Sequence, residues 1–174
     1  MITANPKELE LLKFWLDSDP TAGIEINFPI DAQTGAASTA AVYFELDPEQ
    51  HIGRHTHSAE EILFILEGEA EAAVGDEQER LTEEEMAVVP ANAPHDLYNV
   101  GEGTLRVVGF FSSAAVVSIF EVPLAPLDTK VPPWPGHLFQ RLRRTRPKHH
   151  PLLDRGSHSP RSFLMLPGLH GYRQ

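Results

Sequence analysis

The sequence contains no cysteine and has few basic residues before its last quarter. Without cysteine, the chain has neither disulfide bonds nor thiolate metal ligands, which fits a reducing compartment without requiring one. A long apolar run is also missing, because the longest uncharged stretch, residues 107–120, is too short to cross a bilayer. Residues 1–14 carry four charges and no apolar core, so we expect no secretory signal. We therefore expect a soluble, cytoplasmic protein without a membrane partner.

The net charge of −11 is divided unevenly along the 174 residues. Residues 1–129 hold 24 of the 25 acidic residues and five basic ones, whereas residues 130–174 hold nine basic residues and one acidic residue. A strongly acidic body repels a phosphate backbone. We therefore do not expect nucleic acid as a partner of the folded domain.

Residues 1–22 are predicted to form a helix that packs on the rest of the domain. Asn5 can cap it, and Pro6 suits the first helical position. An apolar stripe follows at helical spacing, made by Leu9, Leu12, Trp15 and Leu16. The helix should end near residues 19–20, where Asp precedes Pro.

Residues 23–128 are predicted to form an all-β sandwich or barrel. Short runs rich in Val, Ile and Phe alternate with turn residues, and no long helical pattern separates them. The expected strands are Ile24–Phe28, Ala40–Leu46, Glu61–Leu66, Ala70–Val74, Met86–Val89, Asp96–Val100, Leu105–Phe111 and Val116–Val122.

Residues 129–174 form a basic tail rich in proline and histidine, with little periodicity. Three interpretations remain open: a disordered segment, a segment that lies on an acidic domain, and a segment that binds an anionic partner. The sharp change in composition also fits a non-native extension.

The residues that carry chemistry begin with His55 and His57. Residues two apart in a strand point to the same side, so both imidazoles face one side, and Glu61 keeps that parity. Two imidazoles and a carboxylate suit Fe, Mn, Ni, Cu or Zn. Glu60 competes with Glu61 as the ligand; parity favours Glu61, and Glu60 would then orient a ligand from behind. One hairpin and one strand later, a proline-bounded turn precedes His95, which a barrel returns beside the first pair.

These two stretches resemble the motifs of the cupin superfamily, small quercetinase-like members in particular. His55, His57, Glu61 and Gly68 match the spacing of the first motif, and Pro90, His95 and Asn99 match the second. The resemblance covers residues 40–121. It implies a jelly-roll barrel, also described as a double-stranded β-helix, with one divalent metal held by His55, His57, Glu61 and His95.

The sequence departs from the family's motifs at three glycine positions, which are Glu49, Glu84 and Asn92 here. Asn tolerates a left-handed backbone better than most residues, so the turn at Asn92 can survive. Since the departures fall in turns, they affect the shape of loops more than the ligands.

Around the metal we expect an apolar pocket, inferred from alternation alone. The expected pocket residues are Tyr43, Leu63, Ile65, Val88, Leu97, Val107 and Phe111. Asn99 is expected to support a turn or a ligand from behind, and Glu61 and Tyr98 are the candidate catalytic groups. The face opposite Glu61 is also apolar, at Ile62, Phe64, Leu66, Val108 and Phe110, which predicts a homodimer through this sheet.

Three functions remain open for such a site. The first is a dioxygenase-type oxidoreductase acting on a small substrate that chelates the metal through oxygen atoms. The second is a redox-neutral isomerase, lyase or cyclase, in which a Tyr or Glu moves a proton. Cupin lyases often carry Tyr two residues after the ligand Glu; this position is Leu63 here. The third is a non-catalytic module that binds a small ligand or a metal.

Overall fold

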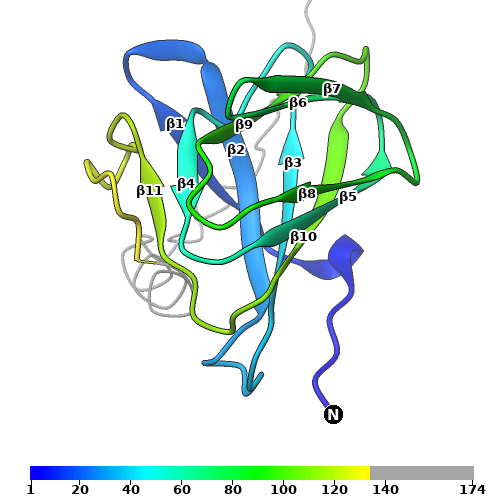
Figure 1. The fold of residues 1–174 in the computed structure, drawn as a ribbon, viewed down its shortest axis with the longest axis vertical. Helices are drawn as coiled ribbons and strands as arrows, with labels where there is room; N and C mark the ends of the chain where they lie inside the picture. The colour runs from blue at the N-terminus through cyan, green and yellow to red at the C-terminus, as the bar shows by residue number, and fades with distance from the viewer. Residues whose placement is uncertain (134–174) are drawn as a thin grey trace, which may run out of the picture.

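The computed structural model describes residues 1–133, which fold as two antiparallel sheets around one hydrophobic core (Figure 1). The first sheet has the order β1 (Leu12–Leu16), β2 (Asp19–Ile30), β3 (Ala40–Leu46), β10 (Leu105–Phe111), β5 (Glu61–Glu67), β8 (Met86–Val89). The second has the order β11 (Ser118–Phe120), β4 (His55–His57), β9 (His95–Asn99), β6 (Ala70–Val74), β7 (Glu77–Leu81). The predicted all-β class is therefore confirmed.

Alternation along the strands places one face of each sheet in the core. In β10, every second residue from Leu105 to Phe111 is buried, while Arg106, Val108 and Phe110 are more exposed. This is the period-two pattern of a strand with one buried face. The inner faces of both sheets contribute to the same apolar cluster, which also surrounds the histidines described below.

The predicted N-terminal helix is wrong beyond its first turn. Asn5 does cap a helix, with its side chain accepting from the amide of Lys7, but this 3₁₀ helix covers only Pro6–Glu8. Residues Leu12–Leu16 instead form the edge strand β1, paired with β2. Phe14 and Leu16 are buried and the residues between and before them are exposed, so burial follows a period of two. Pairing with β2 supplies the backbone hydrogen bonds that overrode the helical spacing of the leucines.

Most predicted strands lie where alternation placed them. Ala40–Leu46, Ala70–Val74, Met86–Val89 and Leu105–Phe111 have the predicted bounds. The last predicted strand is shorter, and the strand Glu77–Leu81 was not predicted. It is an edge strand with four exposed polar residues, so it carries no apolar alternation.

The three motif positions that lack glycine keep a left-handed backbone. Glu49, Glu84 and Asn92 have φ angles of 66°, 69° and 63°. This conformation costs a residue with a Cβ atom about 1–2 kcal/mol relative to its preferred geometry. The left-handed backbone therefore persists at all three positions without glycine, at a local energetic cost.

The described residues contain no helix long and apolar enough to cross a membrane. Most of the predicted basic tail, residues 134–174, lies outside the described part of the chain.

Candidate metal centre

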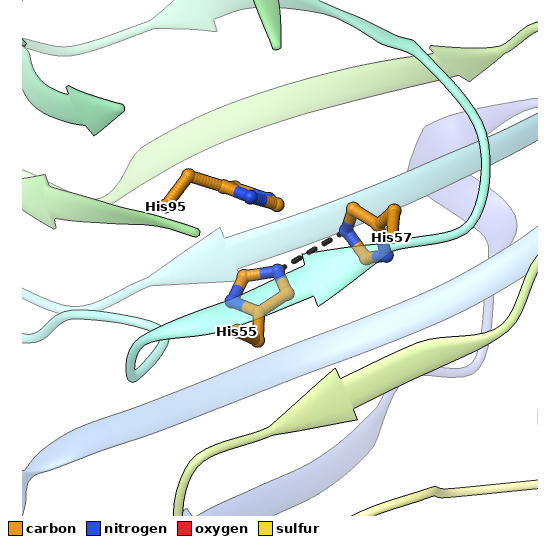
Figure 2. A group of neighbouring side chains, drawn as sticks. All are labelled: His55, His57 and His95. Atoms are coloured by element: carbon orange, nitrogen blue, oxygen red, sulfur yellow. Dashed lines mark hydrogen bonds between the residues drawn. The ribbon is translucent and has the colours of Figure 1, made fainter. Parts of the chain in front are cut away.

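Three histidines from two neighbouring strands meet inside the barrel (Figure 2). His55 and His57 are the ends of β4, so both point to the same side. Strand β9 begins with His95, which pairs with His55 in register. One ligand nitrogen from each of the three imidazoles lies within 4.8 Å of the others, and all three residues are buried.

Each imidazole is held by a partner on its Nδ1 side. Nδ1 of His55 donates to the carbonyl of Gly53 at 2.7 Å, and Nδ1 of His95 donates to the carbonyl of Ala93 at 2.9 Å. His57 Nδ1 lies 2.8 Å from the hydroxyl of Ser118 on β11. Because a carbonyl only accepts, the first two rings carry their proton on Nδ1 and leave a lone pair on Nε2.

The Nε2 atoms face one another. Those of His55 and His57 are 3.1 Å apart, as the dashed line in Figure 2 marks. Nε2 of His95 is buried and has no hydrogen-bond partner. A buried lone pair without a partner is costly. A bound cation would satisfy it.

Glu61 completes the cluster from the first sheet. Its Oε2 lies 3.5 Å from Nε2 of His57 and 3.8 Å from Nε2 of His95. The side chain is buried, while that of Glu60 is exposed. The structure therefore brings Glu61 to the histidines and directs Glu60 to the surface, where it contacts no ligand ring.

Burial sets the charge states of the four groups. It lowers the pKa of His57 to about 3 and that of His95 below its usual value, and it depresses the pKa of His55 strongly. Burial also raises the pKa of Glu61 to about 8. The three rings are therefore neutral near pH 7, which is the state in which imidazole binds metals.

The donor set fits a divalent transition metal. Three imidazole nitrogens and one carboxylate suit Fe, Mn, Ni, Cu and Zn alike, so the ligands leave the metal's identity open. The carbonyls of Gly53 and Ala93 and the hydroxyl of Ser118 hold the rings from behind, as the supporting partners of metal ligands commonly do.

The cluster opens on an apolar cavity of about 30 Å³. Its wall includes Ile24, Ile26 and Phe28 of β2, and the ring of Phe120 stacks on His55 with 4.7 Å between centroids. A cavity of this size holds about two water molecules. Among the described residues that line it, the ionisable groups are the three histidines and Glu61.

Comparisons with known proteins identify the barrel. Residues 42–111 match the family model described as a cupin domain. These residues form a cupin domain. A comparison with curated protein sequences gave no significant match.

Solved structures share this fold at low sequence identity. A Lactobacillus farciminis oxalate decarboxylase is 19% identical, with a TM-score of 0.56 over 66% of this chain and 34% of its own. The Bacillus subtilis oxalate decarboxylase, which has Mn(II) centres, is 15% identical, with a TM-score of 0.52 over 62% of this chain and 30% of its own.

The polyketide cyclase RemF of Streptomyces resistomycificus is 21% identical, with a TM-score of 0.53 over 67% of this chain and 83% of its own. This chain thus spans about a third of the oxalate decarboxylase chains and most of the cyclase. At these identities, the likeness shows the fold alone.

Three of the seven expected pocket residues line the cupin cavity: Leu63, Leu97 and Phe111. Ile65 and Val107 are fully buried in the core away from the cavity wall. Val88 is 56% exposed on the edge strand β8, because its neighbour Val89 takes the inward position.

The two predicted tyrosines lie outside the cavity. Val42 and Phe44 take the inward positions of β3, so Tyr43 faces the other side of the sheet and donates to Glu45 at 2.5 Å. Tyr98 stacks on His51, with 4.8 Å between ring centroids, and does not line the cavity. Alternation in the sequence alone did not decide which face of the sheet either tyrosine takes.

Asn99 supports a turn, one of the two roles expected for it. Its amide nitrogen donates to the carbonyls of Leu46 and Gly103, and its oxygen accepts from the amide of Gly101. These contacts fix the connection between β9 and β10. Sequence reasoning missed Ser118 and Phe120, although both lie two apart on one strand and pair with His57 and His55.

On the other face of β9, one histidine and two carboxylates form a second cluster. Nδ1 of His51 lies 2.7 Å from Asp96 Oδ2, and its Nε2 lies 3.1 Å from Asp19 Oδ2. The other carboxylate oxygen of Asp96 accepts from the amides of Gly53 and Leu97. The hydrogen bond that His51 donates to Asp96 is the main reason that the pKa of His51 is raised above its usual value.

Proposed function

We propose that this cupin binds one divalent transition metal through His55, His57, His95 and Glu61. The observation that carries the proposal is the buried Nε2 atom of His95, which lacks a hydrogen-bond partner and faces two further imidazoles and a carboxylate. The rings are held by their Nδ1 atoms, so the ligand set is arranged before a metal arrives.

Metal content of the purified full chain tests this proposal directly. Protein made without an affinity tag is analysed by inductively coupled plasma mass spectrometry, alongside the variant His55→Ala/His57→Ala. About one metal per chain, lost in the variant, is the expected result. No bound metal after reloading with each of Fe, Mn, Ni, Cu and Zn would refute it.

We further propose a dioxygenase-type oxidation of a small substrate that presents oxygen atoms to the metal. Three neutral ligands and one carboxylate leave coordination positions for substrate, and a redox-active metal supplies the electron transfer. Leu63, Leu97 and Phe111 make the cavity wall apolar. No lysine or arginine lies among the described residues that line the cavity.

The size of the cavity limits the substrate. A space of about 30 Å³ admits a few non-hydrogen atoms, so a bulky flavonol does not fit the described conformation. We therefore favour small enols and 1,2-dicarbonyl compounds over large aromatic polyols. Oxygen-electrode measurements with such a panel, on Fe-, Mn-, Cu- and Ni-loaded protein, test this choice. Oxygen uptake that requires both metal and substrate supports it, and its absence with every pair contradicts it.

A redox-neutral reaction is the second candidate, and Glu61 favours it. Burial raises the pKa of this carboxyl to about 8 in the metal-free site, so Glu61 can accept a proton near neutral pH whenever it leaves the metal. Turnover by the Zn-loaded protein under anaerobic conditions would support an isomerase, lyase or cyclase. Binding of ligands without turnover in either assay would instead indicate a binding module.

We also propose that a second copy of the chain covers the outer face of the first sheet. Ile62 is 39% exposed, Val88 56% and Phe110 48%, and Ile62 pairs in register with both others. A contiguous apolar patch of this kind is typical of an interface. Sedimentation analysis of the chain and of Phe110→Lys tests it: a dimer that the substitution converts to a monomer is expected. A wild-type chain that stays monomeric at high concentration would contradict it.

A further inference from the structure

The carboxyl group of Glu61 lies against the backbone of β10 at Gly109. A Cβ atom placed on Gly109 would overlap Oε1 of Glu61, and it would lie 3.1 Å from Cδ of Glu61 and 2.7 Å from Cγ1 of Val42. Neither neighbour is loosely held, because Glu61 and Val42 are both buried. The carboxyl group therefore occupies the space that any other residue at position 109 would fill.

The backbone gives no other reason for glycine at this position. The φ angle of Gly109 lies outside the left-handed region, so the backbone itself accepts an L residue. The residue sits inside a central strand, paired with Val42 of β3 on one side and with Leu63 of β5 on the other. Glycine in such a place weakens the strand and often marks a close approach by another group.

Inward positions of β10 otherwise carry large apolar residues. Leu105, Val107 and Phe111 are buried, and Gly109 is the gap in this series. The gap lies opposite Glu61, the one acidic side chain that residues 1–133 contribute to the cavity wall. Through it, Oε2 of Glu61 comes within 3.5 Å of His57 Nε2 and 3.8 Å of His95 Nε2.

We infer that Gly109 is a positioning residue that seats the carboxylate ligand and so decides whether the centre has three histidines alone or three histidines and a glutamate. The inference rests on the proposed metal site. With any side chain at position 109, the carboxyl group of Glu61 must leave the cluster. The three imidazoles are held by Gly53, Ala93 and Ser118, so we expect them to stay in place.

Co(II) titration of the full chain tests the inference, because the visible spectrum of bound Co(II) reports its ligands and the titration gives the affinity. We expect Gly109→Ala to weaken Co(II) binding about tenfold or more, with a spectrum that matches Glu61→Ala. The matched control is Gly103→Ala, since a Cβ atom at Gly103 meets no atom within 4 Å and the backbone is not left-handed there. This control should bind Co(II) like the wild type.

A double-mutant cycle distinguishes displacement of the Glu61 carboxyl group from a general disruption of the fold by Gly109→Ala. Once Glu61 is alanine, the carboxyl group is gone, so adding Gly109→Ala should cause little further loss of affinity. If Gly109→Ala alone fails to fold, Val42→Ala/Gly109→Ala removes the contact with Val42 and keeps the overlap with Glu61. Equal additional losses with and without Glu61 would overturn the inference.

Crystal structures of the metal-free wild type and Gly109→Ala give a readout that needs no metal. Displacement of the Glu61 carboxyl group in the variant, with unmoved imidazoles, is expected. A carboxyl group that remains beside His57 and His95 would overturn the inference. A wild-type chain that binds no Co(II) would refute the proposed metal site instead, and these structures would still decide the role of Gly109.

Discussion

Histidines lie on both sides of strand β9, and their surroundings shift their pKa values in opposite directions. On the inner face, burial keeps His55, His57 and His95 neutral, and no lysine or arginine of residues 1–133 lines the cavity that they face. On the other face, His51 lies between the carboxylates of Asp96 and Asp19, and hydrogen bonds raise its pKa. The same residue type is thus a neutral candidate metal ligand in one place and a hydrogen-bond partner of two carboxylates in the other, because desolvation dominates the first and the paired carboxylates dominate the second.

The two clusters also touch the same short segment of chain. Asp96 follows His95 directly and accepts from the amide of Gly53, whose carbonyl holds the ring of His55. The outer cluster therefore fixes the backbone that carries two of the inner ligands. The comparison predicts large effects on metal binding from the inner cluster and effects on folding from the outer one.

The largest expected effect is the loss of an inner imidazole. His95→Ala removes a direct ligand, so we expect metal affinity to fall by more than about a hundredfold, beyond the range typical of supporting residues. His51→Phe keeps an aromatic ring against Tyr98, and we expect it to bind metal with nearly unchanged affinity. Competition titration with a chromophoric chelator measures both. Equal losses in the two variants would abolish the distinction between the clusters.

Metal affinity should depend on pH through Glu61. The metal binds the carboxylate, and the pKa of this group is raised to about 8 by burial, so binding below pH 8 releases one proton. Affinity should rise about tenfold per pH unit from pH 6.5 towards pH 8 and level off above it. The imidazoles, with lowered pKa values, add no slope in this range. Titrations at several pH values measure the slope, which should vanish in Glu61→Gln.

The hydroxyl group of Ser118 should increase the affinity for metal about tenfold. It lies 2.8 Å from His57 Nδ1 and can accept the proton that this nitrogen carries when Nε2 binds metal. We expect Ser118→Ala to weaken binding by this factor, measured by the same chelator competition. Ser113→Ala, which removes an exposed hydroxyl group, is the control. An unchanged affinity in Ser118→Ala would mean that packing alone orients His57.

The outer cluster should contribute about 1 kcal/mol to folding stability through the pair of His51 and Asp96. Because the folded pKa of His51 is raised, this contribution is complete below pH 6.5, its unfolded value, and decreases as pH rises through the folded pKa. Urea unfolding of the wild type and His51→Phe at pH 6 and pH 9 measures it. A stability difference that grows at pH 9 would contradict this assignment.

The smallest effect is expected far from both clusters. Glu84 has a φ angle of 69°, so Glu84→Gly relieves a left-handed backbone and should stabilise the fold by about 0.5 kcal/mol. Metal affinity should stay the same, which would show that the free energy of unfolding can change without any effect on the metal site. Urea unfolding and chelator competition on the same sample check both expectations. Destabilisation by glycine would show that the side chain of Glu84 outweighs the backbone cost.

Local sequence patterns were sufficient to predict most strands of the barrel, but not the N-terminal edge strand or the strand Glu77–Leu81. The alternation in Ala40–Leu46 and Leu105–Phe111 predicted both strands, because a strand buried on one face records this in every second residue. Residues 9–16 misled the prediction, because their leucines suit a helix while pairing with β2 makes them a strand. The strand Glu77–Leu81 went unseen because its side chains face solvent.

The sequence by itself determined the ligand candidates. The spacing of His55, His57 and Glu61 places their side chains on one face of a strand, and a proline-bounded turn precedes His95. The tertiary structure alone decided which carboxylate and which supporting groups meet them. Ser118 reaches His57 from 61 positions away, and Gly109 opens the space for Glu61 from a strand that follows much later. Such contacts depend on register between strands distant in the chain, which no local pattern of side chains specifies.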